Sequence, residues 1–424
     1  MTDALRRRRP AAAGFIFVTM LLDWLVVGIA SPVVPKLIVD FRAGDIASAS
    51  AISGAFATAF ALMAFFASPV LGILSDRFGR RPIILLASAG SAIDCAILAC
   101  APNLWWLGVG RVLAGATAAS ATTAAAYIAD VSPPEKRAAA FGMVSGAFGL
   151  GFALGPALGG LLAGFGIRVP FMVAGGLMVA NVAYGLFLLP ESLPREQRQA
   201  SIGWSRANPL GSLRMLRRHR ELFGLAASLF CSNLAVQSFS VFVLYTIARF
   251  NWSDQANGLG LTLFGSLSVV SAVLVGTLIA RFGARNVVLG GFACGSIGFL
   301  VYGFAPAGII FACALPLTGV WAIAGPPIQS AMSRRVAASE QGELQGAIGS
   351  VRSIAMVVGP AFFTSLFALV SRHRTSVLIG APWFCGALLL VAAAVFSRRA
   401  IPAHEPAATA AVPPVSVAEL PEVV

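Results

Sequence analysis

The stretch "GILSDRFGRRP", from Gly72 to Pro82, places one acid and three arginines between two long apolar runs. A degraded copy of it, "GTLIARFGARN", begins at Gly276. The composition of the chain explains why such a charged cluster lies between apolar segments. An internal repeat explains why the cluster returns.

The composition is that of a membrane protein. The chain has 424 residues, is 58% hydrophobic and only 11% charged, and has a mean hydropathy of +0.85, whereas soluble domains carry roughly 25% charged residues. Apolar runs of about 20 residues, which can cross a ~30 Å hydrocarbon core as helices, recur along the sequence. We therefore predict an all-α membrane protein with twelve transmembrane helices, at residues 12–35, 48–73, 81–101, 104–130, 138–164, 169–190, 222–248, 256–281, 286–304, 308–332, 344–370 and 375–397.

Arginine placement predicts the topology. The first apolar run follows Arg6–Arg9 but is too long for the apolar region of a signal peptide, so it is interpreted as a retained helix. With residues 1–11, the even-numbered loops and the C-terminal tail in the cytoplasm, 22 lysines and arginines lie there and six lie on the opposite side. This asymmetry follows the positive-inside rule and predicts two cytoplasmic termini. The basic residues form no single patch, which argues against nucleic-acid binding.

The repeat predicts two halves. Adding 204 to Gly72, Arg77, Phe78, Gly79 and Arg81 gives Gly276, Arg281, Phe282, Gly283 and Arg285, and the same offset maps Gly155-Pro156 onto Gly359-Pro360. We therefore predict two pseudo-symmetric six-helix bundles, at residues 12–190 and 222–397. A cytoplasmic linker at 191–221, with a short amphipathic helix around Leu213–Leu216, joins them, and a disordered tail follows at 398–424.

Twelve helices in two parallel halves, with "GxLxDRxGRRP" between the second and third, resemble the major facilitator superfamily over nearly the whole chain. Four further stretches resemble the drug:proton antiporters that include tetracycline exporters, namely "LLDWLVVGIASPVVPKL", "GRVLAGATAA", "YIADVSPPEKRAAAFG" and "SEQGELQG". "GFALGPALGG" resembles the signature of exporters in this superfamily. The resemblance implies an antiporter of the bacterial inner membrane that exports a lipophilic drug by alternating access. The proton gradient would drive it, without a cofactor.

The resemblance also assigns roles to the repeated stretch. It implies that Asp76 faces the N-terminus of the eleventh helix, where the helix dipole favours an anion, and that Arg80 pairs with Asp130. These contacts would hold the halves together on the cytoplasmic side in the outward-open state. The alternative for Asp76 is a solvated helix cap. The expected gate comprises Gly72, Asp76, Arg77, Gly79, Arg80, Arg81 and Asp130.

Asp23, Asp94 and Arg111 lie inside apolar spans of the first half. A charge at that depth costs at least ~2.5 kcal/mol on insertion scales, so such residues usually face a bundle interior or an aqueous cavity and serve function. Burial disfavours a charged carboxylate and a nearby arginine favours it, so such acids can exchange protons as their surroundings change. The resemblance implies that these three residues belong to the transport pathway. The alternative is a structural ion pair, for instance between Asp23 and Arg111.

The second half departs from the tetracycline-exporter pattern. Cys294 stands where the ninth helix of those exporters carries an acid, and Ser268 where the eighth carries a histidine. The three histidines, at 219, 373 and 404, fall in loops or the tail. We therefore place any intramembrane proton site in the first half. Recognition of a metal-chelated tetracycline, whose cation prefers hard oxygen ligands, comes into doubt.

Neutral polar and aromatic side chains of the second half suit an amphiphilic or aromatic substrate, although polar residues in bundles often join helices and aromatic residues often only pack. The candidates for substrate binding are Asn233, Gln237, Gln329, Arg352, Phe239 and Phe242. Gly151, Gly155, Pro156 and Gly159 are interpreted as a close helix-packing motif with a proline bend.

Two other function classes compete with drug export. A carrier of an endogenous anionic or amphiphilic metabolite would use Arg111 and Arg352 as anion ligands. A membrane enzyme or scaffold lacks support, because the sequence contains no nucleotide-binding loop, metal-ligand cluster or nucleophile–base constellation. The expected partners are a small-molecule substrate, protons and membrane lipids, with no obligate protein partner.

Overall fold

The computed structural model describes residues 3–118, 120–133, 136–198, 213–372 and 376–402. Twelve helical spans in this part of the chain are long and apolar enough to cross a membrane, which confirms the predicted fold class. The first bundle consists of α1 (Asp3–Phe41), α2 (Ile46–Phe78), α3 (Arg80–Cys100), α4 (Leu104–Ala116), α5 (Ser120–Val131), α6 (Arg137–Ala163) and α7 (Val169–Leu188). The fourth span is thus interrupted between α4 and α5.

The second bundle repeats this plan with more breaks. Its helices are α9 (Phe223–Val236), α10 (Phe242–Phe250), α11 (Asp254–Phe282), α12 (Ala284–Phe304), α13 (Gly308–Cys313), α14 (Leu315–Val320), α15 (Gly325–Ser333), α16 (Gln341–Val370) and α17 (Ala381–Ala400). Short 3-10 turns lie at Gln237–Val241, Trp321–Ala324, Ala338–Glu340 and Val377–Gly380. The tenth span is interrupted by the 3-10 turn Trp321–Ala324, and Pro326 and Pro327 lie in the first turn of α15.

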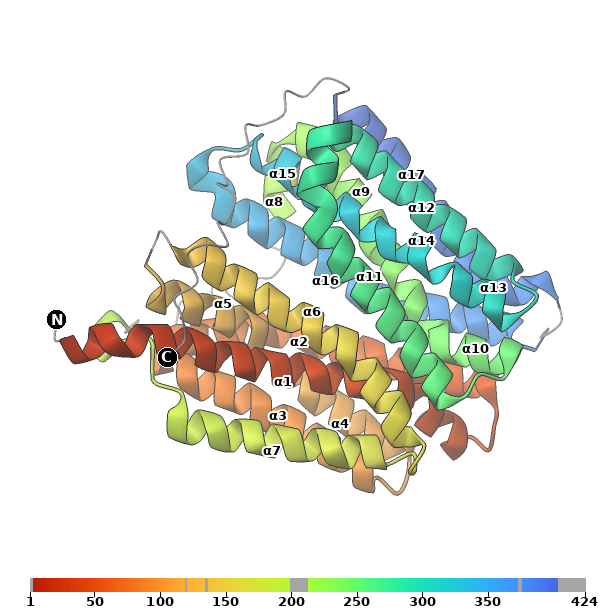
Figure 1. Cartoon of the computed structure of the whole chain (residues 1–424), viewed down its shortest axis with the longest axis horizontal. Helices are drawn as coiled ribbons and strands as arrows, with labels where there is room; N and C mark the ends of the chain where they lie inside the picture. Colours follow the sequence, from red (N-terminus) through yellow and green to blue (C-terminus); the bar gives the residue numbers. More distant parts are fainter. Residues whose placement is uncertain (1–2, 119, 134–135, 199–212, 373–375, 403–424) are drawn as a thin grey trace, which may run out of the picture.

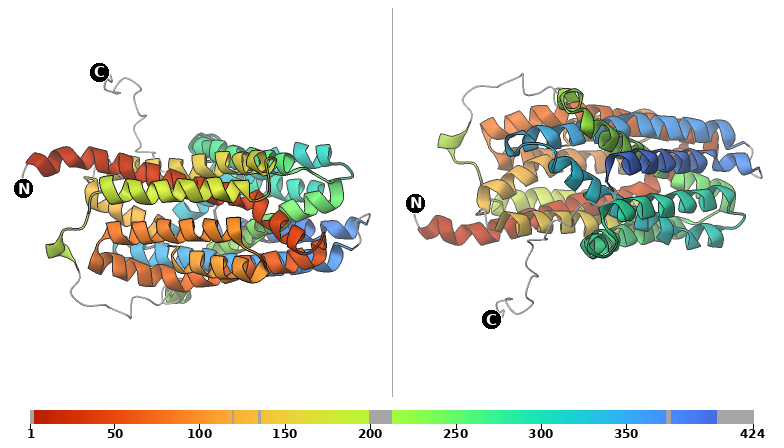
Figure 2. Two further views of the ribbon diagram at one scale, coloured as in Figure 1. Left: turned by 90° about the horizontal axis from the view of Figure 1, so that it is seen from below. Right: turned by 90° about the horizontal axis from the view of Figure 1, so that it is seen from above.

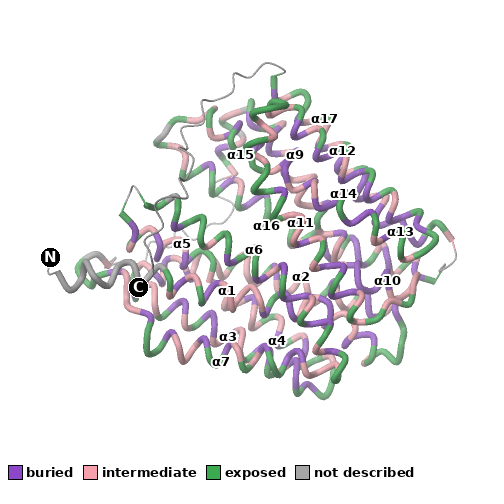
Figure 3. Tube along the Cα trace, viewed as in Figure 1, coloured by how far each residue is buried: buried purple, intermediate pink, exposed green. Residues whose placement is uncertain are grey.

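The two bundles lie side by side, and the helices of the second are inclined to those of the first (Figure 1). Figure 2 shows the same arrangement from two further sides, with the spans extending from one end of the molecule to the other. One end, here called the linker end, holds the start of α1, the end of α7 and the start of α9. The opposite, far end holds the turns after α1, α10 and α16. Buried residues follow the faces between helices, and exposed residues follow the outer faces (Figure 3), as expected for helices that meet lipid tails.

Several predicted boundaries are wrong. The first span does not end at residue 35, because α1 continues through Pro32 and Pro35 to Phe41. Neighbouring helices can satisfy the carbonyls that a transmembrane proline releases. The tail does not begin at residue 398, because α17 runs to Ala400. In the linker, Arg195–Gln197 and Arg220–Leu222 form 3-10 turns. The short helix expected there is α8 (Arg214–Arg218), and its Met215 is buried in the core of the second bundle. The remainder of the linker, 199–212, and most of the tail lie outside the described residues.

Candidate functional site

The repeated stretch is a helix–turn–helix with almost no loop. The predicted loop at residues 74–80 is wrong, because α2 extends to Phe78 and α3 starts at Arg80. Only Gly79 separates the two helices, with φ +110°, a backbone conformation that favours glycine because any Cβ would be strained there. The glycine of the motif therefore permits a one-residue reversal between two membrane helices.

Charged side chains cluster on this turn. The Arg80 guanidinium donates to Asp76, to Ser75 Oγ at 2.8 Å and to Asp130 Oδ2 at 3.2 Å. The expected Arg80–Asp130 pair is thus present. The contact that the structure shows for Asp76 is Arg80 of its own bundle.

Other motif residues hold the turn locally. Arg81 donates to the carbonyl oxygens of Gly185, at 3.3 Å, and Leu186 near the end of α7. The Arg77 guanidinium lies over the ring of Phe78, 5.4 Å from its centroid. A Cβ at Gly72 would meet no atom within 4 Å, so this glycine makes no close approach in this conformation.

The first linker residues complete the cluster, and sequence reasoning missed them. Glu191 Oε1 accepts from the backbone N–H of Arg80 at 2.9 Å, at the first turn of α3, and from those of Ser192 and Leu193. Ser192 Oγ donates to Asp130 Oδ2 at 3.0 Å. Glu191 thereby satisfies a helix N-terminal N–H that would otherwise have no partner. The only sequence signal is the acid that follows Pro190 directly after the sixth span.

Asp23 lies midway along α1 among neutral polar side chains. Ser88 Oγ of α3 and Asn181 Nδ2 of α7 each donate to Asp23 Oδ1, both at 3.4 Å, and Asn181 also donates to Ser88 at 3.3 Å. Ser120 of α5 is a further polar neighbour of this carboxyl group. Asp23 Oδ2 is buried and has no hydrogen-bond partner among the described residues. No described residue forms an ion pair with Asp23.

Asp94 is held in the opposite way, by a cation. Its carboxylate accepts from the Arg111 guanidinium of α4, and the two side chains are 8% and 18% exposed. A Cβ at Gly110 would lie 2.8 Å from Asp94 Oδ1, so glycine leaves room for the carboxylate beside α4. The ion pair considered from the sequence, Asp23 with Arg111, is therefore wrong, because Arg111 bonds to Asp94.

The glycine motif of α6 packs closely against α1. Ideal Cβ atoms at Gly151 and Gly155 would lie 2.7 Å from Trp24 Cβ and 2.6 Å from Gly28 Cα, and one at Gly159 would overlap the Ile29 carbonyl oxygen. Pro156 lies inside the helix. On the other side, its carbonyl oxygen would overlap a Cβ placed at Gly258 of α11. One helix thus packs closely on its own bundle and on the other bundle.

The polar substrate candidates of the second half differ in exposure. Asn233 and Gln237 donate to carbonyl oxygens one turn back on the same helical span, at 2.8 and 3.5 Å. Gln329 and Arg352 are exposed. Ser268, at the position compared with a family histidine, donates to the Phe264 carbonyl oxygen of its own helix at 2.8 Å.

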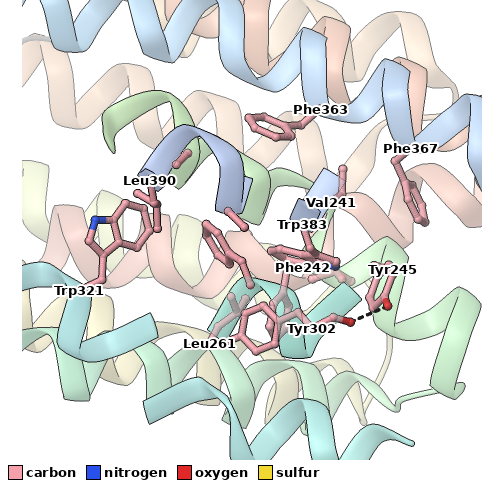
Figure 4. Packing of buried hydrophobic residues seen from close by; sticks show 14 of the residues in the cluster. Val241, Phe242, Tyr245, Leu261, Tyr302, Trp321, Phe363, Phe367, Trp383 and Leu390 are labelled. Atoms are coloured by element: carbon pink, nitrogen blue, oxygen red, sulfur yellow. Dashed lines mark hydrogen bonds between the residues drawn. The ribbon is translucent and has the colours of Figure 1, made fainter. Parts of the chain in front are cut away.

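The aromatic candidates lie in a packed cluster. Phe239 stacks on Phe264 with ring centroids 4.2 Å apart, and Phe242 is fully buried. Figure 4 shows Phe242 with Tyr245, Tyr302 and Trp383, and with the hydrogen bond from Tyr245 Oη to the Tyr302 carbonyl oxygen, 2.8 Å. In this conformation Phe242 contacts other core side chains and faces no solvent.

The bundles contact each other in the far half of the molecule. Lys36 Nζ of α1 and Asp254 Oδ2 of α11 are 2.5 Å apart. Ser50 Oγ donates to the Thr364 carbonyl oxygen at 2.8 Å, and the Ala157 N–H donates to Thr262 Oγ1 at 2.9 Å.

Toward the linker end the ribbons diverge (Figure 1). Cβ atoms placed at Gly72, Gly142, Gly276 and Gly349 would meet nothing within 4 Å. The contacts between the bundles that the structure shows thus lie in the far half of the molecule, and the ribbons of the two bundles separate toward the linker end.

Comparisons with known proteins agree with this architecture. The sequence profile of the Major Facilitator Superfamily matches residues 16–360 and 225–421. The chain is 36% identical to the class C tetracycline resistance protein of Escherichia coli, over 90% of this chain and 95% of that protein. It is 32% identical to the class G protein of Vibrio anguillarum, over 89% and 95%.

Solved structures share the fold. The human organic anion transporter MFSD10 superposes with a TM-score of 0.67 at 23% identity, covering 92% of this chain and 99% of that one. The nucleoside transporter NupG superposes with a TM-score of 0.73 at 14% identity, covering 92% and 98%. The matched profile, the relatives and the twelve-span fold together show that this chain belongs to the major facilitator superfamily of membrane transporters.

Proposed function

We propose that this transporter is a proton-coupled antiporter of the bacterial inner membrane that exports a lipophilic, tetracycline-like drug. Near full-length similarity to six classes of tetracycline resistance protein supports drug export. The observation that carries proton coupling is Asp23, a carboxyl group deep in the membrane whose hydrogen-bonding neighbours are neutral. Without a fixed cation beside it, this acid can be neutral or charged.

The two intramembrane acids then have different roles. Arg111 stabilises the charged form of Asp94, so this pair supplies a fixed internal salt bridge. Asp23 gains and loses the transported proton, and Ser88 and Asn181 stabilise its carboxylate when the proton has left. Both acids lie in the first bundle, the half in which the sequence placed the intramembrane proton site.

Alternating access would arise from closing one end of the molecule while the other end opens. The charge asymmetry supports a cytoplasmic linker end, and the present conformation is then inward-facing. In the outward-facing state the linker ends would close and Asp76 would approach the N-terminus of α16. The cluster of Arg80, Asp130 and Glu191 keeps the turn rigid so that Asp76 stays positioned for that contact.

Side chains of the second bundle determine the substrate specificity. Ser268 and Cys294 offer no carboxylate or imidazole to a cation, so we propose a lipophilic drug bound without a metal ligand from these positions. Exposed Gln329 and partly exposed Asn233 and Gln237 are polar residues available to such a molecule.

One observation favours a second candidate, a carrier of an endogenous anionic metabolite. Arg352 is exposed within α16, and no described residue forms an ion pair with it. An anion could use this guanidinium as a bidentate ligand.

The test uses purified protein in proteoliposomes with an imposed pH gradient and a fluorescent pH indicator. Tetracyclines, lipophilic dyes and organic anions are added in turn. We expect a drug to evoke proton movement, which Asp23→Asn abolishes. Proton movement evoked by organic anions alone, and lost in Arg352→Gln, would replace drug export by the second candidate.

A further inference from the structure

Two buried threonines of the first bundle have hydroxyl groups without a hydrogen-bond partner among the described residues. Thr19 of α1 and Thr123 of α5 are each 2% exposed, and neither hydroxyl has a hydrogen-bond partner among the described residues. By contrast, Thr246 and Thr364 donate to carbonyl oxygens four residues back on their own helices, and Thr117, the C-cap of α4, donates to the Leu113 carbonyl oxygen four residues back. Such back-bonding is the ordinary solution for a threonine in a helix. Thr19 and Thr123 show no such bond among the described residues.

Their positions relate them to Asp23. Thr19 precedes Asp23 by four residues on α1, so it lies on the same face, one turn nearer the linker end. Thr123 follows Ser120, the neighbour of Asp23, by three residues on α5, again one turn nearer the linker end. Both unpartnered hydroxyls therefore lie on the linker side of the buried carboxyl group.

The face of α5 continues with polar groups. Ser120, Thr123, Tyr127 and Asp130 are spaced three, four and three residues apart, which places them along one side of the helix. Tyr127 is fully buried, and its Oη donates to the Pro190 carbonyl oxygen at 2.9 Å, where the linker begins. Asp130 ends the row at the linker end, in the charged cluster around Arg80. The row joins the level of Asp23 to the linker end through the bundle interior.

A buried hydroxyl without a partner is unfavourable, and bound water is the usual partner when protein groups are out of reach. We propose that Thr19 and Thr123 hold water molecules that form a proton path inside the first bundle, from Asp23 to the linker end. The path is separate from the route of the substrate between the bundles. It rests on the proposed function, because it supplies the proton exchange that Asp23 requires.

The proton balance is simple. In the inward-facing state, Asp23 releases its proton to a water molecule held at Thr19 or Thr123, and Asp23 becomes a carboxylate. The excess proton passes between waters along the row and leaves to solvent near Asp130. Ser88 and Asn181 keep their hydrogen bonds to the carboxylate, and no other group changes its charge.

The experiment compares substitutions that keep shape and remove only the hydroxyl. Thr19→Val and Thr123→Val are tested with Thr19→Ser and Thr123→Ser, which retain it. Thr117→Val is the matched control, because that hydroxyl is satisfied within its own helix. Each protein is reconstituted at equal amount, and two rates are measured: proton movement evoked by drug under a pH gradient, and drug–drug exchange without a gradient.

We expect both valine variants to slow drug-evoked proton movement roughly tenfold, the effect of removing about one hydrogen bond from a buried water. Drug–drug exchange, the serine variants and Thr117→Val should stay near the wild-type rate. Wild-type proton movement in both valine variants would overturn the path and favour direct release from Asp23 into the substrate route.

Equal loss of both rates would also overturn the path, because it would show a merely structural role for the two threonines. Absence of drug-evoked proton movement in the wild type would instead reject the proposed function itself.

Discussion

The Asp94–Arg111 pair allows a quantitative test of how the first bundle tolerates charge. We consider Asp94→Asn, Arg111→Gln and the double variant. Each single change leaves one buried charge without its partner, which typically costs about 3–5 kcal/mol. Because the two side chains are 8% and 18% exposed, water screens the remaining charge in part. We expect about 3 kcal/mol of destabilisation for each single variant.

The double variant should be much closer to the wild type. It removes both charges together, and the amides can still bond to each other. Asp94 Oδ1 and Arg111 Nε have no hydrogen-bond partner among the described residues, so the native pair is incompletely satisfied. A pair of that kind contributes little net stability, and we expect the double variant to lose only about 1 kcal/mol.

The assay is reversible unfolding in mixed detergent micelles by titration with sodium dodecyl sulfate, followed by tryptophan fluorescence. The three variants and the wild type form a double-mutant cycle. Single variants that unfold within about 1 kcal/mol of the wild type, or a double variant that loses the sum of the two singles, would refute the assignment of a buried, mutually neutralising pair.

Three further predictions concern other sites. Asp23→Asn should abolish drug-evoked proton movement while leaving expression and drug–drug exchange intact; a persisting proton signal in proteoliposomes would contradict it. Gly155→Val should prevent α6 from packing on α1, because its Cβ would lie 2.6 Å from the backbone of Gly28, and it should cost more than ~3 kcal/mol; unchanged elution and unfolding would argue against the close contact. Lys36→Ala should weaken closure at the far end by removing the bridge to Asp254, which spin-label distances between the two far ends would record as a larger open population.

Hydropathy and residue spacing predicted most of the fold. The twelve spans are local properties, since each depends on residues close together in the chain and on the length needed to cross a bilayer. The two-bundle organisation followed from the repeat of motif residues at a fixed offset of 204. The Arg80–Asp130 pair was implied by the resemblance to a family, whereas the tight packing of the α6 glycines was predicted from their small side chains. The sequence also showed that charged side chains lie inside the first bundle.

Pairing between helices required the tertiary structure. Asp23 and Asp94 look equivalent in the sequence, yet only Asp94 meets Arg111, because the rotation of each helix about its axis decides which side chains face one another. The same holds for Glu191, which reads as the start of a linker but bonds to the first N–H of α3. It holds too for Phe242, which looks available to a substrate but is enclosed by the second bundle.

The sequence by itself determined the membrane-spanning architecture, because the cost of exposing polar backbone and charge to lipid is set by composition along each segment. The tertiary structure decided which intramembrane acid is paired with a cation and which is hydrogen-bonded by neutral side chains. It also decided that two threonine hydroxyls near Asp23 are buried without partners among the described residues. These properties arise from side chains that lie far apart in the chain and become neighbours only when the helices pack.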